Sequence, residues 1–494
     1  MPDVTVPASI TPPLPPPRWS LPDDPDLEWL RKRAKRLRTG VIERDPEALE
    51  LLTAYDPPAA DTISLARAQR VLARAFGFGD WAALRTHLAV VATYSRRFDA
   101  PVDARQTDAD RLLRLGCLDY TDDRSNHVSD AKVLLAGRPE LATASVATMA
   151  LCGAKDGLAA ALAADPGAAN RETGPFRWPP LLYLTYGRLD VGDPVRSTEV
   201  LLAHGADADA GFLWHGLVSP FTALTGAFGG GEQGQPAHPH GPAIAQLLLR
   251  AGADPNDNQT LYNRMFTPAD DHLELLFAHG LGTDRPSPWR RRFGHTYPSP
   301  QQMLGEQLRW AAGHGLTARV RLLLDHGVDA RSPGYHADHD DHTAFELAVA
   351  HGHLEAADLL AEVGGASDRI DDVDRLLSAA LAADRAGIER LREASPALVE
   401  QARGRRPDAV AVAVEHGHDA AIPVLLDLGF DVNAGGRWAT TALHEAAHSG
   451  RADVVATLLA AGADPTRRDE RFDATPADWA AHAGHHALAD DMRR

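Results

Sequence analysis

The sequence has little of what several large protein classes require. It contains two cysteines, Cys117 and Cys152, both in apolar helical stretches, so we expect buried thiols in a reducing compartment rather than a disulfide framework. No apolar run reaches the roughly 18 residues that a membrane-spanning helix needs. The N-terminus lacks a charged start followed by an apolar core, so we expect no secretory signal and a cytoplasmic location.

Aromatic residues and lysine are also scarce. Aromatics make up 6% of the chain, and alanine and leucine dominate the apolar residues, which suits thin helix pairs better than one deep core. Lysine is almost missing while arginine is abundant, a bias that we attribute to a GC-rich, bacterial genome. The net charge of −18 would repel nucleic-acid phosphates. Only the basic stretch 31–38 departs from this, and we interpret it as a solvated helix face, with a docking patch for RNA or an acidic partner as the alternative.

What the chain does have is a repeated unit, and its most complete copy covers residues 441–465. The copy reads Thr441-Ala-Leu-His-Glu-Ala-Ala-His-Ser-Gly450, then Val454-Val-Ala-Thr-Leu-Leu459, then Gly462-Ala-Asp-Pro465. Thr441 is suited to cap a first helix with its hydroxyl group, and Gly450 is suited to end it in the left-handed conformation. The apolar residues from Val454 onward predict the buried face of a second helix, which ends at Gly462.

This unit resembles the ankyrin repeat, whose consensus is close to Thr-Pro-Leu-His-x-Ala-Ala, then Gly-His-x-x-Val-Val-x-Leu-Leu, then Gly-Ala-Asp. Position 442 is alanine where the family prefers proline, and the last unit has that proline at Pro476. The resemblance implies an all-α fold, an ankyrin-repeat α-solenoid with short β-hairpin fingers, in which each unit packs only against its neighbours.

Second-helix glycines recur along the chain and mark out the array. Gly462 follows Gly429 by 33 residues, which is the family period. Two other intervals reach 47 residues, and they predict inserted loops near 228–241 and 285–300. We expect roughly ten units over residues 108–494, several of them degenerate.

The region before the array differs in composition. Residues 1–22 are proline-rich and have no helical period, which predicts a disordered tail. Residues 23–95 predict a small helical domain, with Asp26 and Asp45 as helix caps. We place Phe76, Phe78 and Trp81 in its core. The pattern is similar to a helical domain that precedes ankyrin repeats in many bacterial proteins, and we assign no activity to it.

One segment has the composition of a metal site, namely His336, Asp338, His339 and His342. Imidazole and carboxylate groups at this density can bind zinc or a similar divalent ion. The segment falls where the repeat places an exposed finger, without a recognisable second shell, so we interpret it as a polar loop and keep the metal site as the weaker candidate. Other histidines flank the inter-helix glycines and are expected to cap and pack: His351, His353, His416, His418, His482 and His485.

Aromatic residues recur at the expected fingertips. Trp214, Trp289 and Trp438 each lie nine residues after a second-helix glycine. Tryptophan, tyrosine and arginine are the residue types that anchor protein interfaces. The alternative is that each aromatic ring packs back onto its own hairpin. The expected partner-binding residues are Trp214, Trp289, Tyr335, Trp438, Phe472, Arg290, Arg437 and Arg468.

The sequence therefore predicts a non-catalytic scaffold that binds another protein along the concave face formed by the fingers and the first helices. No phosphate loop, nucleophile elbow or other catalytic constellation is present, so we expect no enzyme activity and no cofactor. We expect a monomer that contacts no membrane. Two alternatives stay open: a ligand- or metal-binding sensor or enzyme built on the inserted loops, and nucleic-acid contact by the basic N-terminal helix.

Overall fold

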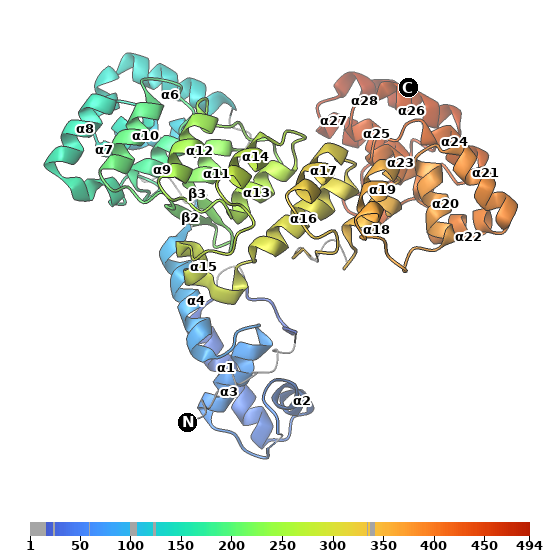
Figure 1. The fold of residues 1–494 in the computed structure, drawn as a ribbon, viewed down its shortest axis with the longest axis horizontal. Coiled ribbons are helices and arrows are strands. Elements are labelled where there is room, and N and C mark those ends of the chain that lie inside the picture. The colour runs from blue at the N-terminus through green and yellow to red at the C-terminus, as the bar shows by residue number, and fades with distance from the viewer. Residues whose placement is uncertain are drawn as a thin grey trace, which may run out of the picture. The chain divides into compact units, whose positions relative to one another are not determined.

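The computed structural model describes residues 16–22, 25–58, 60–98, 106–121, 125–332, 334–335 and 341–494. Its contacts form two compact units, one of Met1–Thr267 with Asp271–Pro298 and the other of Pro268–Asp270 with Ser299–Arg494. Helices dominate both units, and the strands among the described residues are short (Figure 1). The fold is the predicted all-α solenoid with small β elements. The domain limits expected at residues 22, 95 and 108 stay predictions.

The first unit begins with a helical head. Its helices are α1 (Leu27–Ile42), α2 (Pro46–Tyr55), α3 (Leu65–Ala75) and α4 (Trp81–Tyr94). The carboxylates of Asp26 and Asp45 accept hydrogen bonds from first-turn amides of α1 and α2, which fixes where these helices begin. Phe76 and Phe78 lie in the core between these helices, and Trp81 packs at its edge.

Two rows of helices build the rest of the first unit. Helices α7, α9, α11 and α13 pack in sequence as one row, and α8, α10 and α12 form the second row beside it. The strand pair β2–β3 is antiparallel, and β1 pairs with β2 in parallel. The bounds are α5 (Asp108–Gly116), α6 (Ser125–Gly137), η1 (Pro139–Thr143), α7 (Val146–Leu151), α8 (Lys155–Ala164), η2 (Pro166–Asn170), α9 (Pro180–Thr185), α10 (Pro194–Ala203), α11 (Ala223–Phe228), α12 (Gly241–Arg250), α13 (Asn258–Met265), α14 (Asp271–Ala278), α15 (Pro288–Phe293), η3 (Gly294–Thr296), β1 (Ser95–Arg96), β2 (Gly211–Trp214) and β3 (Pro220–Thr222).

The second unit is a run of helix pairs. Helix α16 packs on α18 and α18 on α20, while α23 packs on α25 and α25 on α27, so the first helices of successive pairs lie side by side. Helix α22 packs on α20. It lies between α21 and α23, a position at which other helix pairs in the described part of the chain are joined by a finger without a helix of this length. The bounds are α16 (Pro300–Gly313), α17 (Thr317–Asp325), α18 (Ala344–Ala350), α19 (Leu354–Glu362), α20 (Asp372–Leu381), α21 (Arg385–Ala394), α22 (Leu398–Arg405), α23 (Ala409–Glu415), α24 (Ala421–Asp427), η5 (Arg437–Ala439), α25 (Ala442–His448), α26 (Ala452–Ala460), α27 (Pro476–His482) and α28 (His486–Met492).

The threonine and the histidine that begin the unit at residues 441–444 have a direct structural role. Thr441 caps α25, and its hydroxyl group lies 2.8 Å from Nδ1 of His444. The other ring nitrogen of His444 lies 3.2 Å from the carbonyl oxygen of Ala474, in the next finger. His444 is fully buried, so its ring joins one helix start to the neighbouring unit. A threonine followed three residues later by a histidine therefore links the start of one first helix to the finger of the next unit by hydrogen bonds.

Glycines end the paired helices where the sequence predicts. Gly450 follows α25 with φ +68°, and Gly462 follows α26 with φ +91°. Both conformations are left-handed, which suits glycine because a side chain would strain the backbone. A Cβ atom at Gly450 would also lie 2.6 Å from the ring of His485, whereas one at Gly462 would meet no heavy atom within 4 Å.

The two expected insertions fold in different ways. From Gly229 to His240 the chain forms turns without a helix, and Gly230 pairs with Gln235. The insertion near 285–300 instead contains helix α15, which packs on α4. This second insertion is therefore part of the core of the first unit.

Candidate functional site

A tight turn at the tip of one finger projects a tryptophan from the second unit. Trp438 and Ala439 have φ values of 61° and 56°, so two consecutive residues with side chains are left-handed. The Gly436 amide donates a hydrogen bond of 2.9 Å to the Thr440 carbonyl, and Gly435 pairs with Thr441. Left-handed residues other than glycine cost roughly 1–2 kcal/mol each, so the turn holds strain. The ring of Trp438 is 47% exposed.

Beside this tip lies an open pocket of about 500 Å³, which we call the fingertip pocket. Three successive first helices, α23, α25 and α27, present corresponding positions to it, namely Val412, Glu445 and Trp479. Its lining residues are Arg406, Asp408, Ala411, Val412, Glu415, Gly436, Arg437, Trp438, Thr440, Glu445, Arg471 and Trp479. The pocket therefore has a helical floor and a wall of finger residues.

Neighbouring fingers hold the wall in place. The Glu470 amide donates a hydrogen bond of 2.7 Å to the Trp438 carbonyl, which ties one finger to the next. The Asp469 carboxylate accepts hydrogen bonds from the amides of Arg471 and Phe472 and from the indole of Trp479. These bonds hold the backbone on both sides of the exposed rings in one conformation.

Two carboxylates in the fingertip pocket, Glu415 and Glu445, form no ion pair with any described residue. Removal of water by the surrounding walls raises the pKa of Glu445 to about 7, helped by the nearby charge of Glu415 and opposed by Arg451. Desolvation likewise raises the pKa of Glu415, although Arg406 acts in the other direction. Within the described part of the chain, neither side chain has a hydrogen bond or an ion pair.

A second pocket in the same unit shows the opposite arrangement. It measures about 200 Å³ and includes Glu346, Arg369, Asp374 and Arg405, so we call it the Arg405 pocket. Burial alone would raise the pKa of Glu346, but hydrogen bonds from Arg369, Ser367 and the Thr343 amide lower it to about 2. Hydrogen bonds of 2.7 and 2.8 Å from Arg405 satisfy Asp371 and Asp374. These acidic groups already have cationic partners within the chain.

Sequence reasoning singled out Trp438 and Arg437 but missed Glu415 and Glu445. Arg437 is exposed, and its guanidinium lies 5.5 Å from the centre of the Trp438 ring. The sequence did contain one signal for Glu445. It lies four residues after Thr441, and Trp479 lies four residues after Thr475, so the two residues occupy the same position on successive first helices. Glu415, on α23 of the preceding unit, lines the same pocket as Glu445, and that proximity depends on how neighbouring units pack.

Other expected fingertip residues of the second unit are exposed but lie outside the pocket lining. Phe472 is 62% exposed and its ring centre lies 6.3 Å from that of Trp479. Arg468 is exposed and donates a hydrogen bond to the Asp473 carbonyl. Tyr335 is 36% exposed, and its amide donates to the Glu306 carboxylate at 3.1 Å.

The structure corrects the expected exposure of Trp289. This residue lies on α15 and is only 3% exposed, with its ring centre 5.0 Å from that of Tyr94. Its indole nitrogen donates a hydrogen bond of 3.0 Å to the Asp209 carbonyl. The long insertion folds back on α4, so the ring fills the first unit, as in the alternative interpretation. A ring buried in this way is unavailable to a partner.

Two further expected residues of the first unit are already engaged. Trp214, on β2, is half-buried, and its indole donates a hydrogen bond of 2.9 Å to the Asp119 carbonyl. Arg290, on α15, forms an ion pair with Asp284. We therefore base no proposal on Trp214, Trp289 or Arg290.

The residues of the candidate metal site are only partly described by the structure. His336, Asp338 and His339 lie outside the described residues, and His342 lines the Arg405 pocket. Among the described residues, no group of three or more His, Cys, Asp or Glu side chains is arranged to hold a metal ion.

Histidines between paired helices form a packed row in the second unit. The rings of His351 and His416 stack with their centres 4.1 Å apart, and His353 lies 4.9 Å from His418. His351 and His353 both bond the Gly313 carbonyl, and His418 bonds the His351 carbonyl. Burial lowers the pKa of His353 to about 4, with the neighbouring histidines adding to the effect. These rings join one turn to the next, as a packing role requires.

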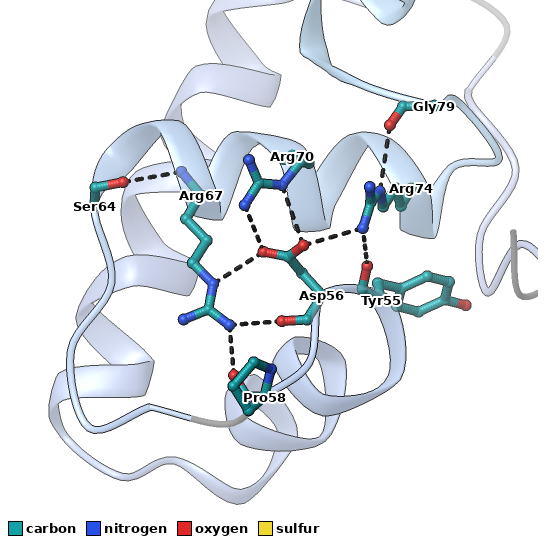
Figure 2. A network of polar contacts seen from close by, with 8 residues as sticks. All are labelled: Tyr55, Asp56, Pro58, Ser64, Arg67, Arg70, Arg74 and Gly79. Atoms are coloured by element: carbon teal, nitrogen blue, oxygen red, sulfur yellow. Dashed lines mark hydrogen bonds and ion pairs between the residues drawn. The ribbon is translucent and has the colours of Figure 1, made fainter. Parts of the chain in front are cut away.

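The helical head holds a compact charge network, shown in Figure 2. The Asp56 carboxylate accepts hydrogen bonds from Arg67, Arg70 and Arg74 of α3, at 2.9, 2.8 and 3.0 Å. Burial raises its pKa, but Arg70 and Arg67 outweigh this and keep the pKa below its usual value. Arg67 and Arg74 also donate to the carbonyls of Asp56 and Tyr55 (Figure 2). The network ties α3 to the end of α2 and is a structural feature.

The comparisons with known proteins agree with the repeat pattern. Residues 376–469 match the family model of ankyrin repeats (3 copies). A further match is the transient receptor potential cation channel subfamily A member 1 homolog of Caenorhabditis elegans, 30% identical over 128 residues, which are 26% of this chain and 11% of that protein. The described helices include none that is both long enough and apolar enough to cross a bilayer. Residues 376–469 include Glu415, Trp438 and Glu445, so the matched region contains most of the fingertip pocket.

Proposed function

We propose that this chain, which carries ankyrin repeats over residues 376–469, is a non-catalytic scaffold that binds another protein at the fingertip pocket. Ankyrin repeats are in general protein-interaction modules, which supports protein as the class of partner. The observation that carries the proposal is Trp438, an exposed ring on a braced, strained turn beside a pocket. A cytoplasmic location and a monomeric state belong to the same proposal.

Rigid recognition explains how such a surface would bind. An aromatic ring with little freedom to lose contributes contact area at low entropic cost. The Trp438 backbone is held by the Gly436–Thr440 bond and by the amide of Glu470, so the ring is presented in one place. Exposed Arg437, in the same finger, and exposed Phe472, in the next finger, add to this surface. Aromatic and arginine side chains at the centre of an interface carry most of its binding energy.

A pair of tryptophan substitutions tests the proposal. Trp438→Ala in the full chain should reduce capture of a partner from an extract of the protein's own cells, measured by quantitative mass spectrometry. Trp29→Ala is the matched control, because Trp29 is 37% exposed and lies on α1 of the head. Unchanged capture by the Trp438 variant, with its circular dichroism spectrum intact, would refute the proposal.

A second candidate function rests on the exposed face of α1. Lys32, Lys35, Arg36 and Arg38 are exposed on one helix and have no ion pair among the described residues. A cluster of this kind attracts phosphate backbones. Salt-dependent retention of RNA by the full chain, lost when these four residues become glutamine, would support this function; no retention at low salt would exclude it.

A further inference from the structure

The fingertip pocket departs from the charge pairing of its own unit. In the Arg405 pocket, the lining residues Glu346 and Asp374 each bond an arginine of the same chain, as does Asp371 beside them. In the fingertip pocket, Asp408 pairs with Arg406 at 3.3 Å. Glu415 and Glu445 are the acidic lining residues that bond no described residue, and the charge of Glu415 acts on Glu445. Two like charges in one pocket that form no ion pair cost stability and favour a cation between them.

Aromatic and apolar side chains line the fingertip pocket together with these carboxylates. Trp438, Trp479 and Val412 line the same pocket as Glu415 and Glu445. Aromatic faces attract cations, and they also pack against the methylene groups of long basic side chains. An acidic floor beside two tryptophans therefore matches a lysine or arginine side chain better than an apolar or acidic one.

The rim has the opposite charge. Arg437 and Arg471 line the pocket from two neighbouring fingers, and the Arg471 guanidinium lies 4.9 Å from the ring centre of Phe472. An acidic side chain would meet these arginines at the rim and be repelled by the floor. The chain as a whole carries a net charge of −18, which adds long-range attraction for a basic segment.

We propose that the fingertip pocket binds an extended segment of the protein partner through one lysine or arginine, whose cation lies between Glu415 and Glu445 and whose stem packs on Trp438. This inference rests on the proposed protein-binding function and specifies the chemistry of its site. The rim arginines pair with acidic residues that flank the basic residue in the segment. The site therefore selects a basic residue within a segment of mixed charge, and not a segment in which every charged residue is basic.

Selection from a random peptide library tests this chemistry directly. The full chain and two of its variants, which each lose two carboxylates, are immobilised and panned separately with the same library of displayed 12-residue peptides. The first is Glu415→Gln with Glu445→Gln; the second, the control, is Glu362→Gln with Glu393→Gln, which changes exposed residues on the second helices α19 and α21. The wild type and the control should enrich lysine or arginine at one fixed position, and the pocket variant should lose that enrichment.

Affinity measurements on one enriched peptide complete the test. Removal of both carboxylates should weaken binding at least about ten-fold, as should replacing the peptide's basic residue with norleucine. Binding should also strengthen from pH 6 to pH 8, because Glu445, whose pKa is raised to about 7, must be ionised to hold the cation. The other charged groups around it are Glu415, Asp408, Arg406, Arg437, Arg451 and Arg471. Thermal melts of all variants establish that each is folded.

The other outcomes separate the two proposals. Peptides that need Trp438 but show no basic preference would overturn this inference and leave the protein-binding function standing. Basic peptides that bind the pocket variant as well as the wild type would also overturn it, because their cation would then lie elsewhere. A library that yields no binder to the wild type counts against it too, since the proposal holds that a short segment suffices.

Discussion

Trp438 and Trp289 hold the same place in the sequence pattern, nine residues after a second-helix glycine, and opposite places in the structure. Trp438 is 47% exposed, whereas Trp289 is 3% exposed. The difference lies in the length of the segment that carries each ring. From Gly429 the chain has room only for a tight turn before α25, whereas from Gly280 it has room for α15 before α16. The glycine offset locates the tip, but segment length decides whether the ring projects or packs.

The largest expected effect comes from removing the buried ring of this pair, Trp289. Trp289→Ala should lower the stability of the first unit by about 3–5 kcal/mol, because the ring loses its packing on Tyr94 and the hydrogen bond to Asp209. Trp438→Ala should change stability by no more than about 0.5 kcal/mol, as for other surface positions. Chemical denaturation of both variants measures the two values, and equal losses would contradict the assigned burial.

Two glycines with the same sequence role offer a second, smaller contrast. Gly450→Ala should destabilise the second unit more than Gly462→Ala, because both strain the backbone but only the first also meets the His485 ring. The shared left-handed strain costs roughly 1–2 kcal/mol. The melting temperature of each variant checks the order. Equal shifts would show that the His485 ring moves aside freely.

The pH dependence of stability should separate the histidine row from the fingertip pocket. The folded pKa values of His353, about 4, and His416, about 2, lie below the ordinary histidine value, so the unfolded chain binds these protons more readily. Stability contributed by these rings is present above about pH 6.5 and is lost as the pH falls below it. Urea unfolding between pH 4 and pH 8 follows the loss, and His353→Asn should flatten it.

Glu445 should act in the opposite direction. Its folded pKa of about 7 lies above the ordinary glutamate value, so the folded state holds this proton more tightly and stability falls as the pH rises through that interval. Glu415→Gln with Glu445→Gln should therefore stabilise the second unit at pH 8 and leave it nearly unchanged at pH 4. Equal stability changes at the two pH values would mean that the carboxylates do not interact as described.

The smallest expected effect concerns the strained turn. Ala439→Gly removes the left-handed strain at φ 56° but adds flexibility to the unfolded chain, so the net gain should be only a few tenths of a kcal/mol. Because the Trp438 ring stays in place, binding should not change. A loss of binding in this variant would show that the hydrogen bonds at Gly436 and Glu470 are not enough to hold the Trp438 ring in place.

Local rules predicted much of the fold. The caps at Asp26, Asp45 and Thr441 and the glycine stop at Gly450 follow from side-chain and backbone chemistry within a few residues. The burial of Trp289 could not be predicted in this way, because it depends on contact with Tyr94, nearly two hundred positions earlier in the chain. The two pocket carboxylates could not be predicted for a related reason, since Glu415 and Glu445 come close only when neighbouring units pack.

The most direct test of the binding surface places a photoreactive side chain at the fingertip. Benzoylphenylalanine in place of Trp438, in the full chain and in its own cells, should cross-link to a partner protein on irradiation. The same replacement at Trp29 should give no such product. Cross-links from position 438, with the joined peptide carrying a lysine or arginine near the site, are the predicted result. Identical products from positions 438 and 29, or none from position 438, would contradict the account.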